Sequence, residues 1–205
     1  MTLRSQCAAG VSLRAVLADD LSARPRDVRV TSCTSDARQV RKGDAFVGIS
    51  AADSDGHDWA AEAVRRGAAA VVCERMLPVF NLPQFVVSDS RTAYGKICQA
   101  LVGNPSKQLK VIGVTGTSGK TTVVRLVAAV LEQAGHHVGT IDSLTYCDGL
   151  DCHSMADLEL TQTMLARYLG QMLANGVTHV VVEVSSRGLS EALLAGIGLD
   201  GVCIT

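Results

Sequence analysis

Short β-branched runs alternate along this chain with longer stretches in which apolar residues recur at helical spacing. In the second half, Val111–Thr115 predicts a buried strand and Thr122–Gln133 an amphipathic helix. Strands are also predicted at Val138–Ile141, Val177–Val184 and Gly201–Thr205, with a loop over residues 142–157 and helices over Leu165–Leu173 and Leu189–Ala195. Strands and helices that alternate at this length form a doubly wound parallel sheet.

The first half has the same alternation on a smaller scale. It predicts strands at Val28–Ser32, Ala45–Ile49, Ala69–Cys73 and Phe85–Val87, and helices at Leu13–Leu17, Trp59–Arg66 and Arg91–Leu101. We expect Trp59 and Tyr94 to pack inside this small α/β unit. The turn-rich segment Gly103–Ser106 separates the halves, so we predict two domains, residues 1–105 and 106–205.

Composition fits a packed protein of this kind. The 205 residues are 47% hydrophobic and 19% charged, which favours a folded core over disorder. A net charge of −1 gives no basis for electrostatic binding to nucleic acid or to an anionic membrane. Neither a membrane-length apolar run nor a signal-peptide core is present, so we expect a cytoplasmic protein. Its seven cysteines are then predicted to be reduced thiols.

The connection between the strand at Val111 and the next helix carries the most specific chemistry in the chain. Residues 115–122 have the sequence T-G-T-S-G-K-T-T. Glycines let backbone N–H groups approach phosphate oxygens, and the start of a helix adds partial positive charge. The common phosphate-loop motif would have glycine where Val114 stands, so this is a tighter variant. The predicted nucleotide contacts are Gly116, Thr117, Ser118, Gly119, Lys120, Thr121 and Thr122.

Three stretches carry a resemblance to a known family. They are Ser35-Asp36-Ala37-Arg38 with Gly43–Val47 and Asp55-Gly56-His57, then Asn104-Pro105-Ser106 before the phosphate loop, and V-V-E-V-S-S-R-G-L at residues 181–189. In these motifs the chain resembles the Mur ligases of peptidoglycan synthesis, and within them the MurE type. The resemblance covers the family's uridine-nucleotide domain and about half of its central ATP-binding domain.

This resemblance implies an ATP-dependent ligase that adds an amino acid to UDP-MurNAc-L-Ala-D-Glu through an acyl phosphate. Lys120 and Glu183 are its implied catalytic residues, and Thr121 and Glu183 the implied Mg²⁺ ligands, since a hydroxyl and a carboxylate suit a hard cation. Glu183 ends its predicted strand, where open α/β sheets place ligand groups. The alternative is a carboxylate that is simply solvated there.

The resemblance also implies contacts to the UDP-MurNAc-dipeptide. The matching positions are Ser35, Ala37, Ala52, Asp53, Ser54, Ser154, Met155 and Ser185. Several depart from the family: Ala37 replaces a serine, Met155 a threonine and Arg187 a histidine. Leu193 stands where many members have an arginine, which an apolar side chain cannot replace at an anionic substrate. These departures predict a weakened substrate site beside an intact phosphate loop.

Two alternatives to a MurE-type ligase stay open. One is a degenerate, non-catalytic nucleotide-binding module, and the other is a generic phosphate-loop ATPase or kinase, which does not explain the Asp55-Gly56-His57 or Glu183 motifs. The pattern of a buried strand at Val202–Thr205 ends the chain, so we expect a truncated product or a fragment, inactive alone. The family's carbamylated lysine and amino-acid-binding domain would lie beyond Thr205. An uncovered last strand also predicts self-association.

Overall fold

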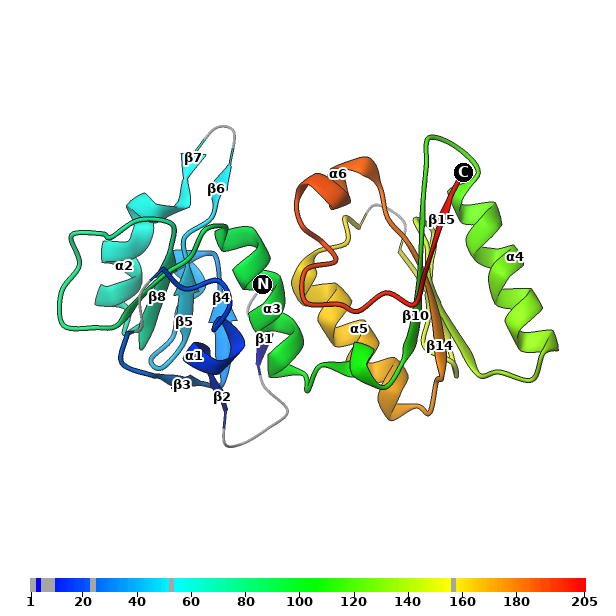
Figure 1. The fold of residues 1–205 in the computed structure, drawn as a ribbon, viewed down its shortest axis with the longest axis horizontal. Coiled ribbons are helices and arrows are strands. Elements are labelled where there is room, and N and C mark those ends of the chain that lie inside the picture. The colour runs from blue at the N-terminus through cyan, green and yellow to red at the C-terminus, as the bar shows by residue number, and fades with distance from the viewer. Residues whose placement is uncertain (1–2, 5–9, 23–24, 52–53, 156–157) are drawn as a thin grey trace. The chain divides into compact units, whose positions relative to one another are not determined.

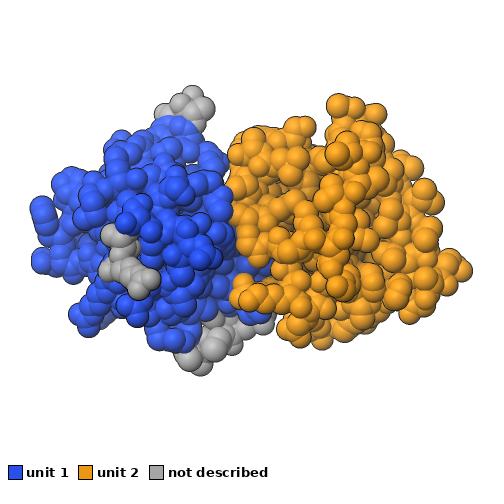
Figure 2. All heavy atoms as spheres, in the orientation of Figure 1, with its two compact units in different colours: residues 1–103 blue, residues 104–205 orange. Residues whose placement is uncertain are grey.

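The computed structural model describes residues 3–4, 10–22, 25–51, 54–155 and 158–205. The chain forms two compact units, residues 1–103 and 104–205, shown in different colours in Figure 2. The division falls inside the turn-rich segment that the sequence indicates, two residues before the predicted boundary.

Unit 1 is built on a five-stranded sheet in the order β1-β4-β5-β8-β9. The strands are β1 (Leu3–Arg4), β4 (Ser32–Thr34), β5 (Ala45–Val47), β8 (Ala70–Cys73) and β9 (Gln84–Val86). The last four are parallel, and β1 is antiparallel to β4. Helix α2 (Ala60–Arg65) covers one face, and α3 (Ser90–Leu101) the other, beside the short α1 (Leu13–Val16) (Figure 1). Phe46 and Val71 lie under α2 in the unit's core.

Short elements fill the connections of unit 1. They are the antiparallel pairs β2 (Val11–Ser12) with β3 (Arg29–Val30) and β6 (Ser50–Ala51) with β7 (Ser54–Asp55), and the 3-10 turns η1 (Ala37–Gln39) and η2 (Gly56–Trp59). The single strand predicted at Val28–Ser32 is therefore wrong, because β3 and β4 belong to different sheets. Tyr94 is buried as predicted. Trp59 is 56% exposed, so its predicted packing role is wrong.

Unit 2 contains a six-stranded sheet in the order β13-β12-β11-β14-β10-β15. Its strands are β10 (Lys110–Thr115), β11 (Val138–Ile141), β12 (Thr145–Cys147), β13 (Cys152–Ser154), β14 (His179–Glu183) and β15 (Gly201–Ile204). A 3-10 turn, η3 (Pro105–Lys107), precedes β10. Strands β11, β14, β10 and β15 are parallel, while β12 and β13 extend one edge as an antiparallel hairpin.

Helices cover both faces of the unit 2 sheet, as a doubly wound fold requires (Figure 1). On one face α4 (Lys120–Gln133) packs Val124 and Ala128 against Val181. On the other, α5 (Gln162–Ala174) packs Leu165, Leu169 and Met172 against Val180 and Val182. Neighbouring residues of β14 thus face opposite helices, which is why the middle of this strand, Val180–Val182, is apolar. The predicted α/β class with parallel sheets is confirmed.

Two predicted segments of unit 2 are wrong. Residues 142–157 are not all loop, because β12 and β13 form a hairpin whose turn is closed by Asp148, which accepts hydrogen bonds from the N–H groups of Leu150 and Asp151. The helix predicted at Leu189–Ala195 lies earlier, as α6 (Ser186–Ser190). Ser185 caps it by accepting from the Gly188 N–H at 3.0 Å, and it ends before Ala192, whose φ is +54°.

The six cysteines in the described part of the chain divide into two groups, and Cys7 lies outside the described residues. Cys147 and Cys152 occupy opposite positions of the β12–β13 hairpin and form a disulfide, which corrects the prediction that all thiols are reduced. Cys33, Cys73 and Cys98 are buried free thiols, as predicted, and Cys203 is half-buried. Across the described ranges, no helix combines the length and the apolar character needed to span a membrane.

Candidate phosphate-binding site

The glycine-rich loop joins β10 to α4 in the geometry that the sequence predicts. Gly116 and Gly119 have φ values of +146° and +76°, a region that only glycine adopts readily. Gly119 is the N-terminal cap of α4, and no side chain caps the helix there. The first N–H groups of a helix lack intrahelical partners. Their partial positive charge is therefore open to an anion at the loop.

The end of β15 holds this loop in place, which the sequence analysis missed. The Thr205 N–H donates to the Thr115 carbonyl at 2.9 Å, and the Thr205 hydroxyl contacts the Ser118 carbonyl. A Cβ atom at Gly116 would collide with the Thr205 backbone and hydroxyl. The first glycine of the loop is thus required both by its φ angle and by the strand packed beside it.

Lys120, Thr121 and Glu183 gather beside the loop. The Lys120 ammonium donates to the Gly116 carbonyl at 3.0 Å, so the side chain folds back over the loop. The Thr121 hydroxyl donates to the Glu183 carboxylate at 2.7 Å. Glu183 is the last residue of β14, and its neighbour across the sheet is Val114 of β10. The structure thus brings together the two oxygen donors predicted to hold Mg²⁺, and this donor set fits a hard cation.

Ser143 joins this cluster from a third strand end. Its hydroxyl lies 3.2 Å from the Thr121 hydroxyl, and its N–H donates to the Glu183 carboxylate at 3.3 Å. The signal that could have found it is position: it follows β11, whose carboxyl end lies at the same edge of the sheet as that of β14.

The residues predicted to contact the uridine nucleotide are divided between the two units. In unit 1, Ser35 and Ser54 are exposed, whereas the Ala37 methyl group is packed into the core. Asp36 beside it accepts from the guanidinium of Arg38, which lowers the pKa of the Asp36 carboxyl to about 2. Ala52 and Asp53 lie outside the described residues.

In unit 2, Ser154 is exposed on β13. Met155 is buried in the core under α5, where its sulfur accepts from the Tyr168 hydroxyl at 3.5 Å. Ser185 is exposed and serves as the cap of α6. The contacts of these residues to substrate stay predictions.

The departures from the family pattern near β14 have structural partners of their own. The Arg187 guanidinium forms ion pairs with Glu159 at 3.1 Å and with Glu191 at 3.0 Å. Leu193 is buried with the core residues under α5. The Arg187 guanidinium is therefore paired with carboxylates of its own unit, and Leu193 offers no cationic group to an anionic substrate.

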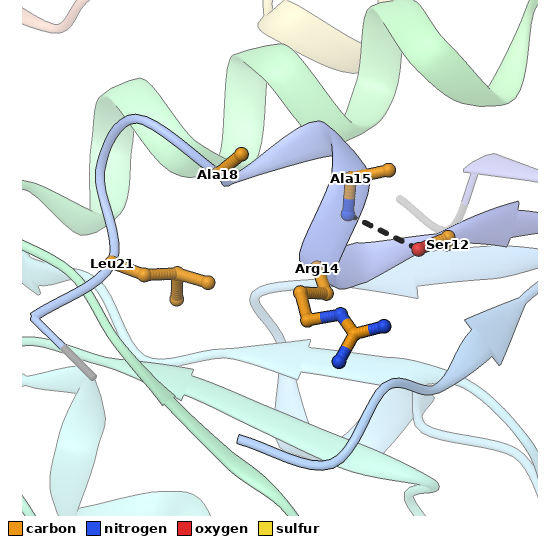
Figure 3. A pocket seen from close by; sticks show the side chains of 5 residues that line it. All are labelled: Ser12, Arg14, Ala15, Ala18 and Leu21. Carbon is orange, nitrogen blue, oxygen red and sulfur yellow. Dashed lines mark hydrogen bonds between the residues drawn. The ribbon is translucent and has the colours of Figure 1, made fainter. Parts of the chain in front are cut away.

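A separate hollow of about 440 Å³ lies beside α1 in unit 1 (Figure 3). It is lined by Ser12, Arg14, Ala15, Ala18 and Leu21. The Ser12 hydroxyl is already used, since it donates to Asp27 at 2.7 Å and accepts from the Ala15 N–H at 3.1 Å. Among the described residues, those that line the hollow include none that the sequence singled out as a site residue.

Comparison with known proteins bears on both units. The profile described as "Mur ligase family, catalytic domain" matches residues 29–101, and that described as "Mur ligase middle domain" matches residues 114–205. A Geobacillus thermodenitrificans protein named UDP-N-acetylmuramoyl-L-alanyl-D-glutamate--2,6-diaminopimelate ligase is 36% identical over 86% of the chain and 36% of its own length. A protein of the same name from Bacteroides thetaiotaomicron is 34% identical over 87% of the chain and 37% of its own length.

Solved structures agree with these relatives. One titled as a UDP-N-acetylmuramoyl-L-alanyl-D-glutamate--2,6-diaminopimelate ligase superposes with a TM-score of 0.75 at 25% identity, over 95% of this chain and 40% of that one. MurF from Acinetobacter baumannii, at 22% identity and a TM-score of 0.52 over 87% of this chain and 37% of that one, shares the fold.

Fold and site together define a two-unit α/β protein whose second unit carries a glycine-rich loop between a parallel strand and a helix. The profiles and the relatives show that the chain belongs to the Mur ligase family. Its relatives are of the MurE type, which confirms the resemblance inferred from the motifs. The chain spans a little over a third of the length of these relatives.

Proposed function

We propose that the glycine loop at residues 116–122, together with Glu183, binds Mg²⁺ and ATP. This site would form the carboxylate-activating part of a ligase that adds an amino acid to UDP-MurNAc-L-Ala-D-Glu. One observation carries the proposal: the Thr121 hydroxyl and the Glu183 carboxylate meet at 2.7 Å beside a glycine loop and an uncapped helix start. The names of the relatives supply the substrate class. ATP is present in the cytoplasm, and we place the protein there.

The proposed reaction has two steps. The γ-carboxylate of the substrate attacks the γ-phosphorus of ATP, so that an acyl phosphate forms and ADP leaves. An amino-acid amine then attacks the acyl carbon and the amide bond forms. Phosphate leaves with the electrons of the broken C–O bond, and the proton lost by the amine nitrogen passes to the departing phosphate or to water. Phosphoryl transfer depends on positioning and charge neutralisation more than on covalent help from the protein.

The residues of unit 2 have definable roles in the first step. The N–H groups of the loop and the Lys120 ammonium would bind the phosphate oxygens. Thr121 and Glu183 would hold Mg²⁺, which neutralises charge on the transferred group when bound. Lys120 reaches the loop already, since its ammonium lies 3.0 Å from the Gly116 carbonyl.

A second candidate function is nucleotide binding without ligation. The ion pairs of Arg187 with Glu159 and Glu191 favour it, because they pair the first arginine after β14 with carboxylates of the same unit. The burial of Met155 and Leu193 favours it as well. In this second candidate the phosphate loop still binds the nucleotide, but the uridine-linked substrate is not held for attack.

Calorimetric titration with ADP, with and without Mg²⁺, tests nucleotide binding. We expect Mg²⁺-dependent binding that Lys120→Ala weakens by roughly 10- to 150-fold, since a charge-assisted contact contributes about 1.5–3 kcal/mol. Lys110→Ala is the matched control, because Lys110 lies at the start of β10, the strand that leads into the loop, and pairs with Asp200 at 2.7 Å. Equal curves for the wild-type chain and Lys120→Ala contradict the proposal.

An amide-formation assay separates the two candidates. We expect the 205-residue chain to give no amide product from UDP-MurNAc-L-Ala-D-Glu, ATP and diaminopimelate or lysine. Product formed above the level of the Lys120→Ala variant would establish ligation by this chain itself and exclude the binding-only candidate.

A further inference from the structure

The turn after β11 contacts the two residues proposed to hold Mg²⁺. Ser143 lies in this turn, with its N–H 3.3 Å from a Glu183 carboxylate oxygen and its hydroxyl 3.2 Å from that of Thr121. The same Glu183 oxygen also accepts from the Thr121 hydroxyl. The position of this turn therefore affects how the Thr121 and Glu183 side chains lie relative to each other.

The Asp142 carboxylate fixes this turn by hydrogen bonds to its backbone. The Asp142 side chain is 1% exposed. One carboxylate oxygen accepts from the N–H groups of Leu144 at 2.8 Å and Thr145 at 2.7 Å. Burial by itself would raise the pKa of Asp142, but these backbone hydrogen bonds, with the bonds from Arg125 and the Thr145 hydroxyl, lower it. The buried carboxylate is therefore ionised at neutral pH.

The second oxygen of Asp142 connects the turn to the helix of the phosphate loop. It accepts from the Arg125 guanidinium at 3.2 Å and from the Thr145 hydroxyl at 3.2 Å. Arg125 belongs to α4, whose first turn contains Lys120 and Thr121. One buried carboxylate thus joins α4 to the end of β11, and through Ser143 to the end of β14.

We propose that Asp142 is a positioning residue of the phosphate site: through Arg125 and the Ser143 turn it holds the Thr121 hydroxyl and the Glu183 carboxylate in the arrangement that accepts a divalent cation. Asp142 contacts neither nucleotide nor metal in this proposal. The proposal rests on the proposed function, since it concerns the same Mg²⁺–nucleotide site.

The same hairpin offers a matched control. Asp148 closes the turn at the far end of β12 in the same way, accepting from the N–H groups of Leu150 and Asp151 at 3.0 and 2.9 Å. It is also buried, at 8% exposure. Its turn lies at the opposite end of the strand from the Thr121–Glu183 pair, so Asp148→Asn reproduces the chemical change without touching the site.

The first measurement is made by titration calorimetry with ADP, in Mg²⁺ and in EDTA. The ratio of the two ADP affinities, here called the gain, is compared between the wild-type chain and each variant. Asp142→Asn keeps an oxygen for the turn but loses the charge that holds Arg125, and we expect it to reduce this gain by about tenfold, as loss of outer partners at metal sites does. Asp148→Asn should keep the gain within about twofold of the wild-type value. An unchanged gain in Asp142→Asn, or an equal loss in both variants, overturns the proposal.

The second measurement needs no nucleotide. In a crystal structure of the ligand-free Asp142→Ala variant, we expect the Thr121 and Glu183 side chains to be separated beyond hydrogen-bond distance, and in Asp148→Ala to remain in contact. Persistence of the contact in Asp142→Ala overturns the proposal. If Asp142→Ala does not fold, Asp142→Asn serves for the same structure. If the wild-type chain shows no Mg²⁺-dependent binding, the proposed function fails, and this structure still decides the positioning role.

Discussion

The Thr121 hydroxyl donates a hydrogen bond of 2.7 Å to the Glu183 carboxylate, across 62 residues of sequence. The bond joins the first turn of α4, which follows the glycine loop, to the last residue of β14, which pairs with the strand before the loop. Each residue alone has an ordinary explanation, since a threonine suits a helix start and a carboxylate suits a solvated strand end. Their contact beside an uncapped helix start supports a shared role with an anion and a cation.

Replacing Glu183 by glutamine should remove the metal dependence of nucleotide binding. The amide keeps the size of the side chain and can still accept from Thr121, but it lacks the charge that a hard cation requires. We expect ADP to bind this variant with the same affinity in Mg²⁺ and in EDTA. Titration calorimetry in the two buffers measures this directly. A Mg²⁺ effect as large as that of the wild-type chain would remove Glu183 from the site.

Gly116→Ala should destabilise the protein and abolish nucleotide binding together. The new Cβ would require a disfavoured φ and would collide with the end of β15 at Thr205. We expect a loss of more than about 2 kcal/mol in the free energy of unfolding, from backbone strain and overpacking combined.

Gly135→Ala is the control for backbone strain alone. Gly135 follows α4 with a φ of +85°, and a Cβ there meets no atom within 4 Å. Gly135→Ala should lower the free energy of unfolding by about 1 kcal/mol and leave nucleotide binding unchanged. Urea unfolding measures the stability of both variants. Equal losses in the free energy of unfolding would show that the contact of residue 116 with Thr205 is unimportant.

The Cys147–Cys152 disulfide should be detectable by alkylation. In denaturant without reductant, we expect both residues to resist iodoacetamide, and to react after reduction. Under native conditions at pH 8, Cys73 should react slowly, because burial raises the pKa of its thiol to about 11. Cys203, which is half-buried, should react faster. Peptide mass spectrometry distinguishes the sites, and alkylation of Cys147 and Cys152 without reduction would show that the bridge is absent in solution.

The open edge of the unit 2 sheet should cause self-association. Strand β15 is the last of the sheet, hydrogen-bonded to β10 alone among the described strands, and Val202 and Ile204 are 62% and 79% exposed. Unpaired apolar edges pair with other chains, and a lysine on the edge opposes this. Sedimentation velocity should therefore show oligomers that Val202→Lys reduces.

Leu126→Lys is the control for that experiment, since Leu126 is also 62% exposed but lies on helix α4 and not on the edge strand. It should leave the oligomers unchanged. A wild-type chain that sediments as a monomer across concentrations would contradict the prediction.

The strand–loop–helix unit at Val111–Gln133 could be predicted because local signals agree there. A β-branched run, two glycines and a helical apolar period all favour the same structure. The hairpin of β12 and β13 could not be predicted on that basis. Its strands are only three residues each and largely polar, and a disulfide and a sheet edge stabilise them. Asp148-Gly149 in the turn was the available signal.

The candidate site was predictable only in part, for a physical reason. Loop residues follow from spacing, and Glu183 follows from its place at a strand end. Asp142 and Arg125 could not be found this way, because their ion pair depends on how α4 lies against β11, and sequence spacing does not give that packing. Likewise, the burial of Ala37 and Met155 depends on which side of a short element faces the core.

A crystal structure of the chain with Mg²⁺ and ADP tests the central claim most directly. We predict that the β-phosphate oxygens accept hydrogen bonds from the backbone N–H groups of the loop at residues 116–122, with the Lys120 ammonium beside them and the metal ion between Thr121 and Glu183. A nucleotide bound elsewhere, or a loop whose N–H groups remain turned away from phosphate, would contradict the account.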